Sequence, residues 1–242
     1  MKTGTLLFDE MVQDIENSDS DAIVFQASNH NPCGIDPTVT QWEKLRDVVV
    51  KKKMFILFDL SYQGLGKGLD EDAFSIRHFL KADTEMMVAT TFSKNFGLYN
   101  DRIGALIFCH AEKSRAVVKN NIKAIIRATY SSPPAFGAKV IARVLQDEKL
   151  FEMWKSELED VRNEICQKRF KLFEALKKFG ANCDFLLNAN GLFAMFDFSS
   201  DDCNSMKQKD GLYLSDDGRI NIACVPLDRI ERLAQVLIQY KK

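Results

Sequence analysis

Several side chains able to do chemistry stand close together in the segment TTFSKNFGLYNDR, residues 90–102. Lys94 follows the hydroxyl residues Thr91 and Ser93, and Arg102 comes eight residues later. An amine can form a Schiff base with an aldehyde, while hydroxyls and a guanidinium fork together can bind a phosphate. A Ser-Lys pair alone is common and usually solvated, so this segment points to chemistry only in combination with other groups.

A second group of this kind ends the apolar run MFILFDL, residues 54–60. Asp59 lies at its end and Tyr62 follows three residues later. An acid at the C-terminal end of a strand commonly points into the ligand crevice of an open α/β sheet, although many such acids cap the next helix instead. The carboxylate can hold a protonated ring nitrogen and the phenol can contact a ring oxygen. Together with Lys94, these are the groups that a pyridoxal phosphate site needs.

Two other patterns are weaker. The stretch GLGKG, residues 64–68, has no Ser or Thr after its lysine and lacks the G-x-G-x-x-G spacing, so a plain surface turn is the better interpretation. The three histidines, His30, His78 and His110, form no H-E-x-x-H motif, and no cysteine lies in a C-x-x-C pair, so we expect no metal site. Reduced thiols in an intracellular compartment are the simplest interpretation of the six scattered cysteines.

Composition narrows the class of protein. The chain has 242 residues, 46% of them apolar and 28% charged, which fits a globular protein of one large domain or a large and a small one. Lys and Arg total 33 against 34 Asp and Glu, so the basic excess of a general nucleic-acid binder is missing. Apolar runs stay well below the ~18 residues that cross a bilayer, so we expect no membrane span.

The elements that must position the reactive groups alternate along the first half of the chain. Apolar runs predict strands and amphipathic patterns predict helices, with Thr38 or Thr40 as a helix cap. The expected strands are 21–27, 54–60, 85–91 and 103–109, and the expected helices are 38–53 and 70–81. This alternation predicts an α/β layer on a largely parallel sheet.

The pattern changes near residue 112. We expect a helix over 112–129, a nearly continuous helical stretch over 135–179 with a bend near Asp147, and a terminal helix over 228–240. Short strands are expected at 192–198, 211–214 and 219–225. The chain is therefore predicted to divide into a sheet domain, residues 1–150, and a connecting helix with a small C-terminal α/β domain, residues 151–242.

Six segments, in order and with family-like spacing, resemble the class I aminotransferases of the aspartate aminotransferase type: HNPCGIDPTVTQWEKL, FDLSYQG, TTFSKNFGLYNDRIGAL, IIRATYSSPPAFGA, NGLFAMF and DGRINIA. The resemblance implies the fold type I of pyridoxal-phosphate transferases, with a partial large domain and a small domain joined by a long helix. It covers nearly the whole chain. The family's large N-terminal segment has no counterpart, so we expect a fragment or a truncated or spliced form.

The resemblance implies a role for each matching residue at the cofactor ring. Lys94 matches the lysine that forms the Schiff base with pyridoxal phosphate and then carries the proton. Asp59 matches the carboxylate that pairs with the pyridine nitrogen. Asn31 and Tyr62 match the residues that hydrogen-bond the ring's phenolic oxygen, and the Asn31-Pro32 peptide is expected to be cis.

The same resemblance implies the contacts to phosphate and substrate. Thr91, Ser93 and Arg102 match the phosphate grip, and Ser131 matches a phosphate contact made across the subunit interface. Arg219 matches the clamp on the substrate α-carboxylate, with Phe193 as an aromatic wall. Arg127 matches the arginine that binds the distal carboxylate in the neighbouring subunit's site, which implies a homodimer with shared sites.

Three residues depart from the family's usual pattern. Cys33 stands in place of Thr, Ser61 in place of a small Ala under the cofactor ring, and Gln26 in place of a common His.

The resemblance implies amino transfer from L-aspartate to 2-oxoglutarate, with amino acids and 2-oxo acids as the small-molecule partners and the cytoplasm as the expected compartment, mitochondria being left open. Two alternatives stand beside it: an aromatic-amino-acid aminotransferase, and a catalytically incompetent remnant acting as an interaction or dimerising subunit.

Overall fold

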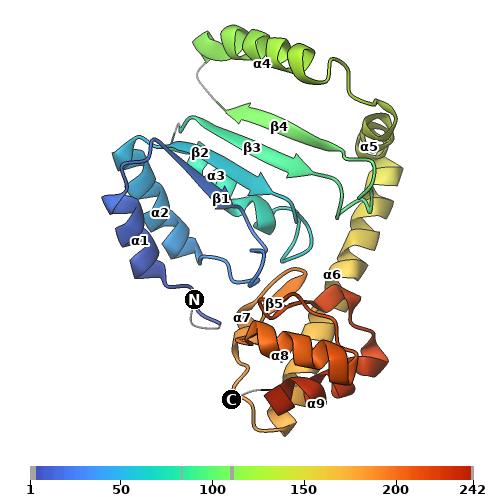
Figure 1. Cartoon of the computed structure of the whole chain (residues 1–242). Coiled ribbons are helices and arrows are strands. Elements are labelled where there is room, and N and C mark those ends of the chain that lie inside the picture. The colour runs from blue at the N-terminus through green and yellow to red at the C-terminus, as the bar shows by residue number, and fades with distance from the viewer. Residues whose placement is uncertain (1–3, 83, 110–111, 241–242) are drawn as a thin grey trace.

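The computed structural model describes residues 4–82, 84–109 and 112–240, and His110 lies outside these ranges (Figure 1). Over residues 4–82 and 84–109, α-helices and strands largely alternate, beginning with a helix that the sequence patterns did not predict. These elements are α1 Phe8–Asn17, β1 Ala22–Gln26, α2 Val39–Lys52, β2 Phe55–Leu60, α3 Phe74–Leu80, β3 Met86–Thr91 and β4 Gly104–Cys109. Thr38 caps α2 through a capping box with Gln41.

The sheet has the order β1-β2-β3-β4, with β1, β2 and β3 parallel and β4 antiparallel to β3. The predicted largely parallel sheet is therefore confirmed. Gln26 of β1 lies opposite Asp59 of β2, and Leu60 lies opposite Thr90 of β3. The carboxyl ends of the parallel strands thus meet at one edge, where the predicted site residues follow them.

One face of the sheet carries an aromatic core beneath the helices α1, α2 and α3. Phe25, Trp42, Phe58 and Phe79 pack against one another with ring centroids 5.3 to 6.3 Å apart, in edge-on or tilted geometry. These four side chains are almost fully buried. Their burial anchors the strands that end at the site.

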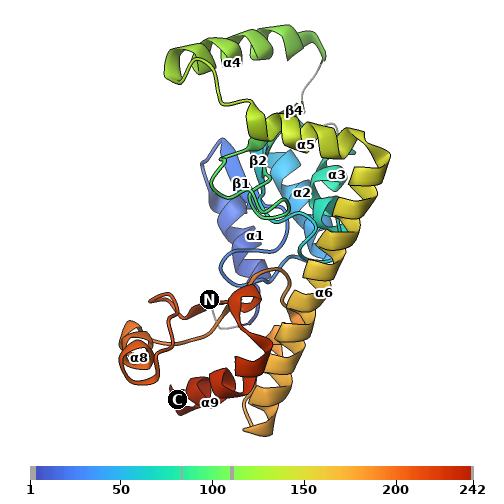
Figure 2. The same ribbon diagram turned by 90° about the vertical axis from the view of Figure 1, so that its right-hand side faces the viewer.

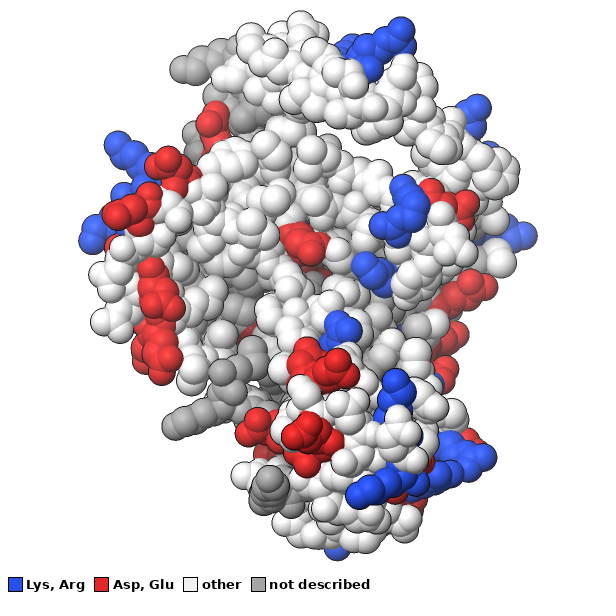
Figure 3. All heavy atoms as spheres, in the orientation of Figure 1, with Lys and Arg blue, Asp and Glu red and all other residues white. Residues whose placement is uncertain are grey.

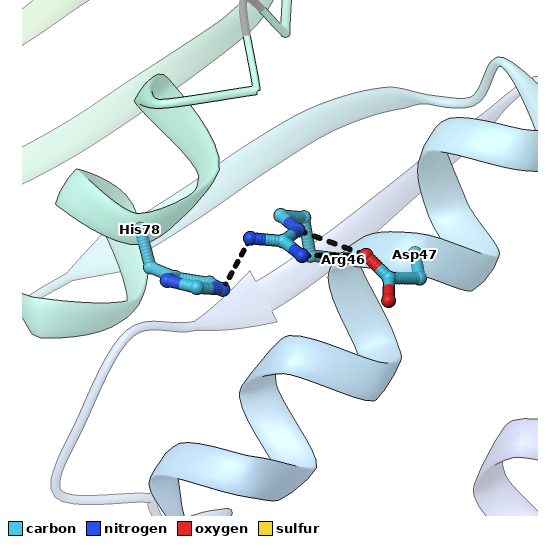
Figure 4. Close-up of polar contacts among 3 residues, drawn as sticks. All are labelled: Arg46, Asp47 and His78. Carbon is cyan, nitrogen blue, oxygen red and sulfur yellow. Dashed lines mark hydrogen bonds and ion pairs between the residues drawn. The ribbon is translucent and has the colours of Figure 1, made fainter.

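Helices α2 and α3 are also joined by a polar contact (Figure 4). Arg46 Nη1 lies 2.8 Å from His78 Nε2, and Arg46 Nη2 lies 2.7 Å from Asp47 Oδ1. Burial and the Arg46 charge both lower the pKa of His78. The neutral imidazole therefore accepts the hydrogen bond from the guanidinium.

The second half is mostly helical, as predicted. Its helices are α4 Arg115–Thr129, α5 Phe136–Gln146, α6 Glu148–Lys178, α7 Phe185–Asn188, α8 Ser200–Ser205 and α9 Ile230–Tyr240. The predicted bend is confirmed at Asp147, an extended residue whose side chain caps α6 by accepting from the Leu150 amide. Helix α4 projects above β4, away from the body of the molecule, and buries none of its described residues (Figure 2).

The predicted C-terminal strands are shorter than expected. The structure has β5 Phe193–Met195 paired antiparallel with β6 Arg219–Asn221, and a 3₁₀ turn follows over Ile222–Cys224. The strand predicted at 211–214 is wrong. A helical turn over Met206–Asp210 ends at Gly211, which has a positive φ, and the Leu212 amide bonds back to the Met206 carbonyl. The apolar alternation of this segment instead packs Leu212 and Leu214 onto the small core.

That second core lies between α6, α9 and the β5-β6 pair, and it also takes in Tyr62 and Leu65 from the loop after β2. The long helix α6 runs down one side of both halves (Figure 2). The predicted domain boundary after residue 150 falls in its first turn, and the division stays a prediction.

Charges of both signs are interspersed over the face drawn in Figure 3. Within the described ranges, the six cysteines form no disulfide bond with one another. In the described ranges, no helix is long and apolar enough to cross a membrane, and no group of three or more His, Cys, Asp or Glu side chains is placed to hold a metal ion.

Candidate active site

The loop after β3 brings Lys94 over the ring of Tyr62. Lys94 Nζ lies 4.6 Å from the Tyr62 ring centroid, a cation–π distance. Helix α6 holds this loop in place, because Trp154 Nε1 donates to the Asn95 carbonyl at 2.8 Å and the Trp154 ring stacks on Phe96 at 4.6 Å. Trp154 was not predicted as a site residue, since no local pattern connects it to a loop 59 residues earlier.

Burial and two neighbouring charges shift the pKa of Lys94. Its pKa lies below the ordinary value of 10.5, chiefly because the amine is partly desolvated; Asp59 opposes this shift and Arg102 adds to it. The Lys94 amine is therefore neutral at a lower pH than a solvated lysine. It is suited to act as a nucleophile or to carry a proton.

Asp59 and Tyr62 lie at the carboxyl end of β2. The Ser61 hydroxyl donates to Asp59 Oδ1, and Asn31 Nδ2 donates to Tyr62 Oη at 3.4 Å. Burial is the main cause of a raised pKa for the Tyr62 phenol, the Asn31 bond opposes it, and the Asp59 charge adds to it. The phenol therefore keeps its proton at neutral pH.

Asn31 also joins the two halves of the chain. Arg219 Nη1 donates to Asn31 Oδ1 at 2.8 Å, although the two residues are 188 positions apart. The Arg219 guanidinium lies 4.9 Å from the Phe193 ring centroid, and that ring meets Tyr62 edge-on at 5.8 Å. Arg219 and Phe193 of the β5-β6 pair thus face the same place as Tyr62 and Asn31 of the sheet half.

The turn that carries Asn31 is held from β1. The Gln26 amide donates to the Asn31 carbonyl at 3.0 Å and accepts from the Asn31 N–H at 2.9 Å, and the Asn31-Pro32 peptide is cis, as expected. The resemblance marks Gln26 only as a departure from the family's usual pattern. The structure gives this side chain a position that supports Asn31.

The three residues expected to bind phosphate lie beside Lys94. Thr91 Oγ1 is 2.8 Å from Ser93 Oγ, and the Ser93 side chain is buried. Arg102 has a left-handed backbone, with φ of 53°, and donates to the Tyr99 carbonyl at 2.9 Å. Such strained non-glycine residues often occur at functional sites. Two hydroxyls and a permanent cation are therefore available within one loop.

The comparisons with known proteins now decide the family. Residues 1–237 match the family described as aminotransferase class I and II. The chain belongs to this family. It is 37% identical to the aspartate aminotransferase of Escherichia coli (strain K12) over 239 residues, which are 97% of this chain and 60% of that protein. It thus spans about 60% of the length of this relative.

Solved aminotransferases share the fold. The aromatic-amino-acid aminotransferase of Burkholderia pseudomallei, solved covalently bound to pyridoxal phosphate, is 31% identical with a TM-score of 0.92 over 98% of this chain and 60% of its own. The aspartate aminotransferase of Trypanosoma cruzi is 30% identical with a TM-score of 0.93 over 98% and 62%. The resemblance and the fold class expected from the sequence are both confirmed.

Two residues expected from the aminotransferase family stand apart from the others. Arg127 and Ser131 lie at the C-terminal end of the projecting α4, where Arg127 Nη1 donates to Ser131 Oγ at 2.6 Å. Both side chains are exposed, and Ser131 has a positive φ of 61°. The structure does not bring them to Lys94 of the same chain.

The glycine-rich stretch was wrongly interpreted as a surface turn. It is largely buried, and its amides surround the Asp72 carboxylate: the N–H groups of Gly64, Gly66 and Lys67 donate to it at 2.9 to 3.0 Å. Asn29 Nδ2 joins them at 3.0 Å. An internal carboxylate thus takes the place that an external anion would occupy in a phosphate loop. In the sequence, Asp72 has the pattern of an acid in the first turn of a helix. Its contact with the glycine-rich stretch was therefore not predicted.

A buried arginine supports the aromatic wall. Arg169 of α6 donates to the carbonyl oxygens of Gly191, at 2.5 Å, and Phe193, at 3.2 Å from both Nη atoms. Burial lowers its pKa to about 10, so it stays charged at neutral pH. Arg169 was not predicted, because its partners are main-chain atoms.

The charges around Lys94 lead to a pH prediction. Replacing Arg102 with Gln should raise the pKa of Lys94, and replacing Asp59 with Asn should lower it, because a like charge disfavours the ammonium and an opposite charge favours it. Competitive labelling with acetic anhydride reads the neutral amine by mass spectrometry across pH. The labelling midpoint should move to higher pH in Arg102→Gln and to lower pH in Asp59→Asn, with exposed Lys67 as the internal control. If both variants keep the labelling midpoint of the parent chain, the placement of these two charges near Lys94 is contradicted.

Proposed function

We propose that this chain carries the active site of a pyridoxal-phosphate-dependent aminotransferase that exchanges an amino group between L-aspartate and 2-oxoglutarate, giving oxaloacetate and L-glutamate. The observation that carries the proposal is the convergence of Lys94, Asp59 and Tyr62 at the carboxyl ends of the strands with Arg219 from the small C-terminal half. Family membership supports the reaction class.

The donors and charges fit pyridoxal phosphate. Thr91, Ser93 and Arg102 would hold its phosphate, Asp59 its ring nitrogen, and Lys94 its aldehyde carbon. The fit rests on this chain's own chemistry, since one carboxylate, one amine with a lowered pKa and a hydroxyl-guanidinium loop occur together. When bound, the cofactor supplies an electron sink that stabilises negative charge at the substrate Cα.

Binding of the substrate and transfer of its proton would be carried out by residues of this chain. Arg219 would bind the substrate α-carboxylate with its planar fork, and the Phe193 ring beneath the guanidinium limits the directions it can take. Lys94 would take the proton from the substrate Cα and deliver it to the carbon that carries the cofactor's aldehyde, a role that requires an amine able to be neutral near physiological pH. Asn31 and Tyr62 would orient the ring oxygen through their shared hydrogen bond.

The placement of Arg127 and Ser131 supports a homodimer. Both residues end a projecting helix, and their side chains are exposed. We propose that in a symmetric dimer they reach the partner's site, where Arg127 binds the distal carboxylate and Ser131 the phosphate. Burying a distal carboxylate without a cationic partner is expensive, so Arg127 would favour dicarboxylate substrates.

A second candidate is an aromatic-amino-acid aminotransferase, because similar solved structures include enzymes of that name. Arg127 distinguishes the two. In Arg127→Leu we expect amino transfer from aspartate to 2-oxoglutarate to fall about a hundred-fold in kcat/KM, because a desolvated carboxylate loses its partner. Transfer from phenylalanine to an apolar 2-oxo acid should change by less than about three-fold.

This experiment measures glutamate formation, or the matching amino acid, with each substrate pair and added pyridoxal phosphate. The matched control is Arg115→Leu, which removes an exposed arginine from the other end of the same helix. Equal losses on both substrate pairs would contradict the carboxylate role of Arg127. A chain that turns over phenylalanine faster than aspartate would favour the aromatic candidate.

A further inference from the structure

Ser61, the residue that follows β2, contacts the side chain of Asp59. Ser61 is half-buried between Asp59 and Tyr62, and its hydroxyl donates to Asp59 Oδ1. In the described part of the chain, Asp59 Oδ2 takes part in no hydrogen bond and the carboxylate in no ion pair. One oxygen of this carboxylate is thus bound from within the chain and the other is left as an acceptor.

The hydroxyl of Thr90, on the neighbouring strand β3, has a different kind of hydrogen-bond partner. Thr90 Oγ1 donates to the Leu60 carbonyl at 3.1 Å, so it completes the hydrogen bonding of the main chain. Ser61 lies one residue beyond that carbonyl and bonds to a charged side chain instead. Two similar hydroxyls beside the same strand end therefore have separable roles, one toward the backbone and one toward the carboxylate.

A hydrogen bond from Ser61 has two physical effects on Asp59. It restricts rotation about the bond that carries the carboxylate, so that Oδ2 keeps one direction. It also occupies Oδ1, which leaves Oδ2 as the carboxylate oxygen that can accept from a further donor. Both effects prepare Asp59 to accept from a cationic N–H donor without first reorganising.

We propose that Ser61 is a positioning residue that holds the Asp59 carboxylate with Oδ2 free for the protonated ring nitrogen of the cofactor. The inference rests on the proposed function, because it presumes that Asp59 receives that ring. Ser61 acts through Asp59 and takes no part in proton transfer. Its effect is therefore specific to ligands that carry a hydrogen on the ring nitrogen.

The test compares the binding of two ligands to the full chain. One is pyridoxal phosphate and the other is its 1-deaza analogue, in which carbon replaces the ring nitrogen. Dissociation constants are measured by equilibrium dialysis, so the readout does not depend on turnover. In Ser61→Ala we expect the affinity for pyridoxal phosphate to fall about ten-fold, since a hydrogen bond to a charged group is lost, while the affinity for the 1-deaza analogue changes less than about two-fold.

Three further variants make the result specific. Ser61→Thr keeps a hydroxyl and should keep the parent chain's preference between the two ligands. Thr90→Val removes the neighbouring hydroxyl and should not alter the preference between the two ligands. In an Asp59→Asn background, Ser61→Ala should have no further effect on that preference, because the carboxylate it holds is gone.

Each alternative outcome overturns the proposal. An equal loss for both ligands in Ser61→Ala would show that Ser61 shapes the pocket and does not act through Asp59. Unchanged affinities would show that its hydrogen bond is unimportant for binding. If the parent chain binds both ligands but with equal affinity, Asp59 does not hold the ring nitrogen. If it binds neither ligand, the proposed function itself fails, and the role of Ser61 fails with it.

Discussion

Replacing Lys94 with alanine is expected to remove amino transfer, lowering kcat by about a thousand-fold or more, because one amine serves as both nucleophile and proton carrier. The same change should abolish the mass increment that borohydride leaves on a chain treated with pyridoxal phosphate. Turnover is followed by glutamate formation, and the attachment site is found by mass spectrometry of peptides. The structural basis is the position of the Lys94 amine over Tyr62, within electrostatic range of Asp59 and Arg102.

The matched control for this change is Lys67→Ala. Lys67 lies in the adjacent glycine-rich loop, its side chain is exposed, and the backbone N–H that donates to Asp72 is retained. This variant should keep full activity and the mass increment. A parent chain that gains no increment at Lys94 and transfers no amino group would instead favour the interaction-subunit alternative. The exposed α4 and the half-exposed Leu106 and Ile107 on β4 offer an apolar surface for that role.

Replacing Asp72 with alanine is expected to lower the free energy of unfolding by about 3 to 5 kcal/mol. Asp72 is only 3% exposed and accepts from three backbone amides and from Asn29. Its removal leaves these buried donors without their acceptor, and burying an unpaired donor is costly. Urea unfolding monitored by circular dichroism and tryptophan fluorescence measures the change.

Two variants make the stability test specific. Asp70→Ala removes an acid from the same turn, but its carboxylate is 80% exposed and pairs with Arg77 at 2.7 Å, so we expect a loss of about 1 kcal/mol or less. Asp72→Asn keeps one acceptor oxygen and should fall between the two. If Asp72→Ala unfolds no more easily than Asp70→Ala, the carboxylate does not organise the glycine-rich loop.

Local patterns in the sequence were enough for much of the fold and for part of the site. Thr91, Ser93, Lys94 and Arg102 lie within one short segment, so chain connectivity alone brings them near one another. The apolar run that ends near Asp59 indicated a strand, and the strand places that acid at the sheet's carboxyl edge. The bend at Asp147 followed from the interruption of a helical pattern by a good capping residue.

Strand pairing could not be predicted from local patterns of this kind. The segment 211–214 has the alternation of a strand, but a strand also needs a neighbour, and the amide of Leu212 turns back to Met206 instead. The helix α8 was missed because its capping box, Ser199 with Asp202, precedes no apolar repeat long enough to reveal it. In both segments, packing against the small core outweighed local propensity.

The amino-acid order alone was sufficient to select the reactive groups and the layered α/β fold, because these depend on residue types and on spacings of a few positions. The tertiary structure determined which of these groups lie in contact with one another. It joined Asn31 to Arg219 across 188 positions, set Trp154 of α6 against the Lys94 loop, and enclosed Asp72 within amides of the glycine-rich loop. Contacts between distant segments depend on how whole helices and strands pack, and no short-range pattern records that packing.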